Sequence, residues 1–107
     1  MIRRWLPITL GAALVLAGAA GAATPSGPRV EIKAFKFVPA QLTVPAGATV
    51  TWTNADEETH TVTATDRAYT STGLEGKETY AHRFAAPGTY TYFCLLHPHM
   101  TATVVVK

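Results

Sequence analysis

Residues 88–106 read GTYTYFCLLHPHMTATVVV, two alternating runs on either side of a tract rich in sulfur and imidazole. Apolar residues occupy every second position of both runs: Tyr90, Tyr92 and Cys94, then Ala102, Val104 and Val106. A period of two is typical of a β-strand with one buried face. We therefore predict two strands, joined by the tract between them.

The same alternation recurs in short runs from Val30 onward, separated by Gly, Pro and Asp, and no helical period of useful length occurs. The runs are marked by Val30 and Ile32, Leu42 and Val44, Val50 and Trp52, Val62 and Ala64, and Tyr80, His82 and Phe84. Phe35 and Phe37 are out of phase with Ile32, which suggests a β-bulge near Ala34. About seven short strands predict an all-β, antiparallel β-sandwich.

The first 23 residues have the features of a secretory signal peptide. Arg3 and Arg4 precede the mostly apolar residues 6–16, and residues 20–22 (AGA) form a small-x-small cleavage pattern. We predict a signal peptide over residues 1–23, a short flexible leader over 24–29 and one domain over 30–107. The mature chain would then be periplasmic or otherwise exported, with no membrane segment.

Charge and cysteine content restrict the function. Without Arg3 and Arg4 the chain has seven Lys or Arg against seven Asp or Glu. This balance does not favour nucleic-acid binding, which requires a basic face. The single cysteine, Cys94, excludes an internal disulfide, and a lone thiol in an oxidising compartment is a liability unless something occupies it. A bound metal would do so.

The tract Cys94–Met100 concentrates metal-binding side chains. It contains the only cysteine, two of the four histidines and, once Met1 is removed, the only methionine. Thiolate, imidazole and thioether donors suit copper in both oxidation states, and two imidazoles, one thiolate and a weak axial thioether form a blue-copper site. The tract can supply Cys94, Met100 and either His97 or His99. We favour His97, because His99 is adjacent to Met100 and should point the opposite way.

A second imidazole must come from elsewhere, and His60 is the best candidate. His60 shares strand parity with Val62 and Ala64, so its side chain should face the core, as should those of Cys94 and Met100. Without the tract, His60 would more simply be a packed or exposed histidine, Cys94 a small buried apolar residue and Met100 part of the core. His82, in register with Tyr80 and Phe84, is interpreted as a packed strand histidine.

Three motifs resemble a known family. VTWTN (residues 50–54), HTV (60–62) and GTYTYFCLLHPHM (88–100) are similar to those of the cupredoxins, and the short Cys-x-x-His-x-x-Met loop resembles that of the amicyanins. The resemblance implies a Greek-key sandwich with one copper ion bound by His60, Cys94, His97 and Met100. It also implies that Thr61, where many relatives carry Asn, and Asn54 lie behind the ligands, with Thr61 joining the two ligand loops.

The function implied is single-electron transfer by a carrier that is not an enzyme. Leu95, Leu96, Pro98 and His99 would form an apolar patch for redox partners, such as a c-type cytochrome or a periplasmic dehydrogenase, and the carrier is expected to be a monomer. The sequence leaves open a copper storage or delivery module, and a structural sandwich that binds zinc or nothing. The acidic run Asp56–Glu58 is interpreted as a solvated loop.

Overall fold

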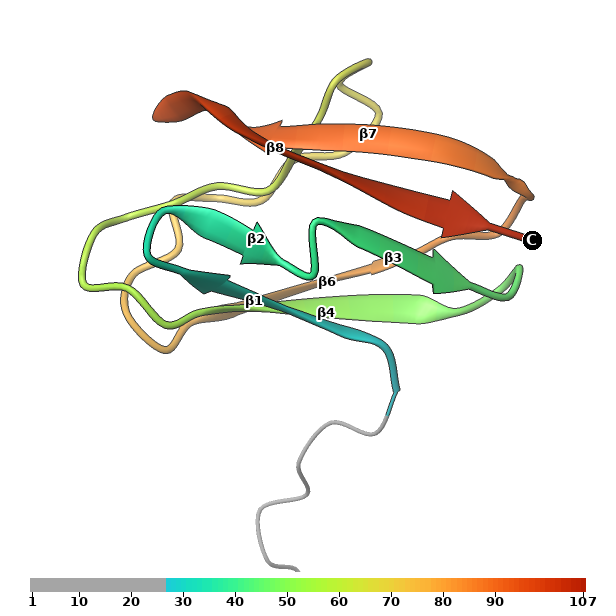
Figure 1. Ribbon diagram of the computed structural model, residues 1–107, viewed down its shortest axis with the longest axis horizontal. Helices are drawn as coiled ribbons and strands as arrows, with labels where there is room; N and C mark the ends of the chain where they lie inside the picture. Colours follow the sequence, from blue (N-terminus) through green and yellow to red (C-terminus); the bar gives the residue numbers. More distant parts are fainter. Residues whose placement is uncertain (1–26) are drawn as a thin grey trace, which may run out of the picture.

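The computed structural model describes residues 27–107, which form two packed β-sheets (Figure 1). Residues 1–26, which include the predicted signal peptide and part of the predicted leader, lie outside the described residues. The strands are β1 (Arg29–Lys33), β2 (Lys36–Val38), β3 (Gln41–Val44), β4 (Thr49–Asn54), β5 (Thr63–Ala64), β6 (Thr79–Arg83), β7 (Gly88–Cys94) and β8 (His97–Val106). β1 begins at Arg29, the last residue of the predicted leader.

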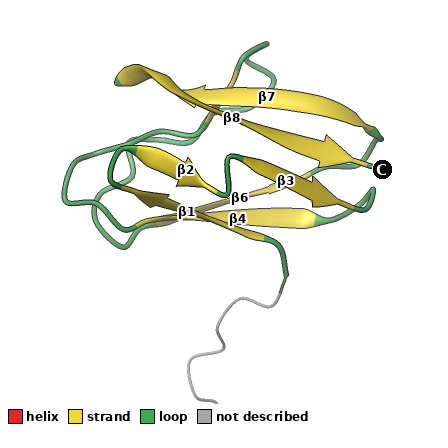
Figure 2. Ribbon diagram, viewed as in Figure 1, coloured by secondary structure: helices red, strands yellow, loops and turns green. Residues whose placement is uncertain are grey.

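One sheet has the strand order β2-β1-β4-β6 and the other the order β3-β8-β7-β5. The predicted all-β sandwich is confirmed, and within residues 27–107 the chain forms only strands, turns and loops (Figure 2). The sheets are mixed rather than purely antiparallel, because β1 pairs with β4 and β3 with β8 in parallel. Such parallel pairs arise because the chain crosses to the opposite sheet and returns in the same direction.

The core lies between the two sheets and consists mostly of the alternate residues that the sequence identified, joined by Tyr69 and Leu74 of the irregular segment. Trp52 of β4 and Tyr92 of β7 are almost fully buried, and their rings meet edge to face across the sandwich at 5.4 Å between centroids. Phe37 of β2 packs on the Tyr92 ring from another side, at 4.7 Å. Edge-to-face aromatic packing adds specific attraction to the burial of apolar area. These contacts hold the sheets at a fixed separation.

The predicted bulge near Ala34 is wrong, since Ala34 and Phe35 form the two-residue turn of the β1–β2 hairpin. Both have positive φ angles, 52° and 59°, as a primed hairpin turn requires. This turn explains the change of phase after Ile32. A register irregularity occurs instead between Phe93 and Cys94, at the end of β7.

The side of the sandwich opposite the β3 edge is covered by residues 65–78, which form an irregular excursion as expected from their sequence. Tyr69 in this segment stacks on His82 of β6, with ring centroids 4.0 Å apart. His82 is therefore a packed strand histidine, as predicted. Within residues 27–107 no helix has the length and apolar character needed to cross a membrane.

Candidate metal centre

The predicted ligands come from segments that meet at one end of the sandwich. β1 and β4 are parallel neighbours, so both finish at this end, and the chain then turns into β2 and into the loop that carries His60. β7 ends and β8 begins at the same end, seen at the left of Figure 1. The order and direction of the strands thus bring His60 close to the Cys94–Met100 segment, although they are far apart in the sequence.

Cys94 and His97 face each other across a tight hairpin. They are the last register pair of β7 and β8, and only Leu95 and Leu96 lie between them. Side chains of directly opposed residues lie on the same face of a sheet, within reach of each other. Cys94 is fully buried, whereas His97 is half-buried at the rim. The hairpin therefore presents one thiol and one imidazole side by side.

His60 reaches the same point from the opposite side. Its backbone forms a two-way bridge with Leu74, with N···O distances of 3.1 and 2.7 Å, which fixes the loop in place. Its ring is fully buried, and its Nδ1 lies 3.7 Å from the Cys94 sulfur. The His60 ring also meets the His97 ring edge on, with centroids 5.2 Å apart. Three of the four predicted ligands therefore lie together.

Met100 and His99 point in opposite directions from β8. Met100 is buried, at 3% exposure, and His99 is exposed. The His99 ring lies 6.4 Å from that of His97, on the outer side of the hairpin. The alternation used to prefer His97 over His99 thus agrees with the burial of the side chains.

Thr61 connects the two ligand segments. Its backbone N–H donates to the Cys94 sulfur at 3.3 Å, and its hydroxyl accepts a hydrogen bond from the Leu95 amide at 2.8 Å. The same hydroxyl contacts that of Thr63 at 3.0 Å. The position expected to join the loops therefore does so through its hydroxyl. A hydrogen bond to the sulfur also stabilises a thiolate.

Asn54 is fully buried and organises the loop that precedes His60. Its amide nitrogen donates to the carbonyl oxygens of Glu58 and Leu74, both at 2.8 Å, and its side-chain oxygen accepts from the Asp56 amide at 2.9 Å. A buried amide with both ends satisfied fixes the groups it contacts. Asn54 thus sets the path of the loop rather than contacting a ligand.

Asp56 and Phe35 belong to the site, although the sequence did not indicate either. The solvated-loop interpretation holds for the exposed Glu57 and Glu58, but it is wrong for Asp56, whose side chain is only 12% exposed. Its carboxylate accepts from His60 Nε2 at 2.8 Å. The Phe35 ring packs edge on against both His60 and His97, at 5.2 and 5.0 Å.

The charge state of Asp56 follows from its contacts. Burial alone would raise the pKa of this carboxyl, but hydrogen bonds from the amides of Phe35 and Ala34 and from His60 outweigh it. The pKa of Asp56 is therefore lower than its ordinary value, and the group is ionised at neutral pH. An ionised carboxylate only accepts hydrogen bonds, so the proton of His60 is assigned to Nε2. The lone pair of the neutral ring then lies on Nδ1, the nitrogen that faces the Cys94 sulfur.

The donor types fit copper by their chemistry. Among the described residues, 27–107, no three His, Cys, Asp or Glu side chains form a group that could hold a metal ion by themselves. The pair in contact is instead His60 with Cys94, flanked by His97. A blue-copper site needs two imidazoles and one thiolate, with the fourth position filled by a weak thioether such as that of Met100. These donors suit copper, because the His60 proton lies on the nitrogen that faces Asp56 and leaves the other nitrogen free.

Exposed, mostly apolar residues adjoin the half-buried His97, either in the sequence or, for Phe35, by ring contact. Leu95, Leu96 and Phe35 are 45%, 54% and 38% exposed, and Pro98 and His99 are also exposed. Large apolar side chains on the surface of a small protein, when contiguous, mark interaction sites. The four residues of the predicted patch are thus exposed, as is Phe35, and their role in binding partners stays a prediction.

The sequence matches a known family: residues 6–106 match the model of the cupredoxin-like domain, and the chain belongs to this family. It is 37% identical over 83 residues to amicyanin-alpha of Methylorubrum extorquens, covering 73% of this chain and 70% of that protein. The Cu(I) structure of a methionine-to-alanine mutant of amicyanin has a TM-score of 0.75 at 28% identity, covering 80% of this chain and 87% of that one.

The fold also occurs inside a larger protein. A copper-containing nitrite reductase from Thermus scotoductus has a TM-score of 0.72 at 27% identity, and the match covers 78% of this chain but only 23% of that one. The same sandwich thus serves as one part of an enzyme. Membership of the family alone does not decide between a carrier and an enzyme domain.

Proposed function

We propose that this protein is an exported carrier that moves single electrons through one copper ion bound by His60, Cys94, His97 and Met100. The observation that carries the proposal is the buried Cys94 sulfur, 3.7 Å from His60 Nδ1 and paired with His97 across a two-residue turn. The similarity to amicyanins supports the same conclusion. Bound copper would supply the one-electron couple, and no substrate bond would be made or broken.

The residues of the chain would keep the site rigid while the charge changes. The Thr61 amide donates to the Cys94 sulfur and would stabilise the thiolate once it holds the ion, and the Thr61 hydroxyl holds the turn that follows it. Ligands fixed by hydrogen bonds move little when the metal charge changes, so a small reorganisation accompanies transfer. Burial of His60, Cys94 and Met100 also keeps water from the donors.

Storage or delivery of copper would require donors that exchange readily. Three of the four donors here are buried, and only His97 is near the surface. This arrangement favours retention of the ion with electrons entering and leaving at the His97 edge. The exposed Leu95 and Leu96 around that edge suit a brief apolar contact with a redox protein, such as a c-type cytochrome or a periplasmic dehydrogenase. We expect the carrier to act as a monomer.

The test is addition of Cu(II) to the purified protein without residues 1–23. The proposal predicts an intense visible charge-transfer band that disappears on reduction, returns on oxidation and is absent from Cys94→Ala. A colourless complex, or a band that survives in Cys94→Ala, would refute it. Stopped-flow reaction with a reduced c-type cytochrome would then test whether the coloured form accepts electrons.

A further inference from the structure

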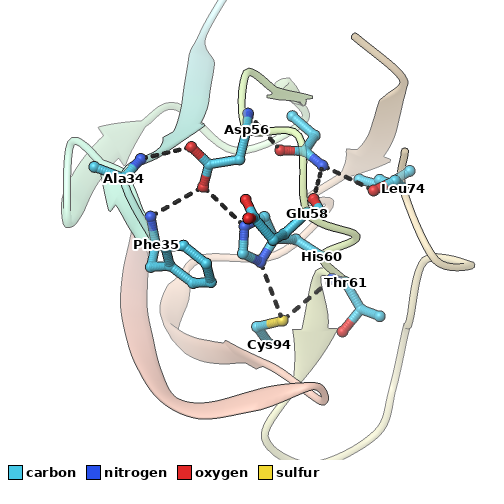
Figure 3. A network of polar contacts seen from close by, with 9 residues as sticks. Ala34, Phe35, Asp56, Glu58, His60, Thr61, Leu74 and Cys94 are labelled. Carbon is cyan, nitrogen blue, oxygen red and sulfur yellow. Dashed lines mark hydrogen bonds and ion pairs between the residues drawn. The ribbon is translucent and has the colours of Figure 1, made fainter. Parts of the chain in front are cut away.

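The Asp56 carboxylate joins two segments that the sequence places far apart. Its Oδ1 accepts from the Ala34 amide at 2.7 Å, and its Oδ2 accepts from the Phe35 amide at 2.9 Å and from His60 Nε2 at 2.8 Å. Figure 3 shows the carboxylate between the β1–β2 turn and the His60 ring, with the Cys94 sulfur on the far side of that ring. One ionised group thus satisfies three donors.

The contact with His60 determines which ring nitrogen is free. Because the Asp56 carboxylate accepts the hydrogen bond from Nε2–H, the neutral ring carries its lone pair on Nδ1, which faces the sulfur. Loss of the carboxylate would let the ring adopt the other tautomer or rotate. Groups that hold a histidine by its second nitrogen fix both its tautomer and its orientation, and their removal typically lowers metal affinity about 10–100-fold.

The contact with the turn determines where Phe35 lies. Ala34 and Phe35 both adopt left-handed backbone conformations, at φ of 52° and 59°, which are disfavoured for residues with a Cβ atom. Neither residue is Gly or Asn, which usually occupy such turns. The successive amides of this turn converge on the Asp56 carboxylate, and this anion stabilises the conformation.

Phe35 in turn contacts both imidazoles. Its ring lies edge on to His60 and to His97, with interplanar angles of 88° and 83°. His97 is half-buried at the surface, and Phe35 is the aromatic neighbour that it shares with His60. A shift of the turn would therefore move the Phe35 ring away from His97 while leaving Cys94 in place.

We propose that Asp56 is a positioning residue for both imidazole ligands, acting on His60 through its Nε2–H and on His97 through the turn that seats Phe35. The inference rests on the proposed copper site, but its geometric part concerns the metal-free protein. Asp56 would not contact the ion. Its role would be to hold two rings from different segments in one arrangement before metal enters.

The first test uses ¹⁵N NMR of the copper-free protein. The wild type should show a protected His60 Nε2–H resonance and downfield amide protons for Ala34 and Phe35, and Asp56→Ala should lose all three. Asp56→Asn keeps one acceptor oxygen but places an NH₂ group near the remaining donors, so it should lose at least one of them. Glu57→Gln, a change at an adjacent exposed carboxylate, is the matched control and should change none.

The second test uses copper. Relative to wild type and Glu57→Gln, Asp56→Ala should bind Cu(II) about 10–100-fold more weakly, with a shifted charge-transfer band and altered copper hyperfine splitting in the EPR spectrum. Phe35→Ala should broaden the His97 ring signals of the Cu(I) form. Adding Phe35→Ala to Asp56→Ala should change the His97 signals no further, because the two residues act in series.

The two proposals fail in different ways. If wild-type protein gives no coloured complex, the copper function is refuted, while the NMR of the metal-free protein still tests the Asp56 contacts. If the wild type is coloured and folded Asp56→Asn retains the His60 Nε2–H signal, copper affinity and band position, the positioning role is overturned. If Asp56→Ala loses amide dispersion, Asp56→Asn takes its place in each comparison, and the same outcomes then decide.

Discussion

Replacing Asn54 with alanine should destabilise the metal-free protein and loosen the loop that carries Asp56 and His60. Asn54 is fully buried at the end of β4, and its side chain makes three hydrogen bonds. At roughly 1 kcal/mol for each, their loss amounts to about 3 kcal/mol.

The estimate of about 3 kcal/mol also depends on whether the former partners of Asn54 find other hydrogen bonds. The Leu74 carbonyl keeps a second donor, the His60 amide at 3.1 Å, whereas the Glu58 carbonyl and the Asp56 amide lose the Asn54 side chain as their partner. Both lie in a loop that is partly exposed, so water recovers part of the loss. We therefore expect Asn54→Ala to lower the free energy of unfolding by about 2–4 kcal/mol, a decrease in Tm of roughly 10–30 °C for a domain of this size.

The assay is urea denaturation of the copper-free protein, because bound metal would mask part of the change. Thr53→Ala is the control on the same strand, as the Thr53 side chain makes no hydrogen bond within residues 27–107, and it should cost less than about 1 kcal/mol. Asn54→Asp keeps the acceptor but has no donor, so it should be no more stable than Asn54→Ala. An Asn54→Ala protein within about 0.5 kcal/mol of Thr53→Ala would refute the role assigned to this amide.

Thr61→Val should cost about 1–2 kcal/mol because the Leu95 amide loses its acceptor, whereas Thr61→Ser should retain most of the stability; thermal denaturation of both variants checks this. Burial raises the pKa of Tyr69, so the unfolded state ionises first and stability falls as the pH rises above about 10. Tyr69→Phe should reduce this alkaline loss in urea titrations from about pH 8 to about pH 11, and an unchanged profile would contradict it. His97→Ala should abolish the copper colour and His99→Ala should preserve it, while the reverse result would exchange the two assignments.

The sandwich could be predicted because burial on one face imposes a period of two on each strand. Trp52, Tyr92 and Val104 occupy alternate positions, and all are buried as expected. Met100 and His99 followed the same rule, with Met100 buried and His99 exposed, although the pairing of β7 with β8 skips residues 98–100. The parallel pairing of β1 with β4 could not be predicted, because it depends on the path of the chain between sheets rather than on local pattern.

The features missed by sequence reasoning share a physical cause. The turn at Ala34 and Phe35 lacks the residues that usually signal such a turn, and the anion that stabilises it is 21 or 22 residues away. Asp56 lies in an acidic run whose other members are exposed, so composition alone suggested a solvated loop. Contacts between distant segments decide both features, and only the folded structure brings those segments together.

A crystal structure of the copper-loaded protein would test the account most directly. The account predicts a single copper ion bonded to the Nδ1 of His60, the sulfur of Cys94 and a ring nitrogen of His97, with the Met100 sulfur as a weaker fourth neighbour. An ion bound instead through His99, or at a position without the Cys94 sulfur, would contradict it.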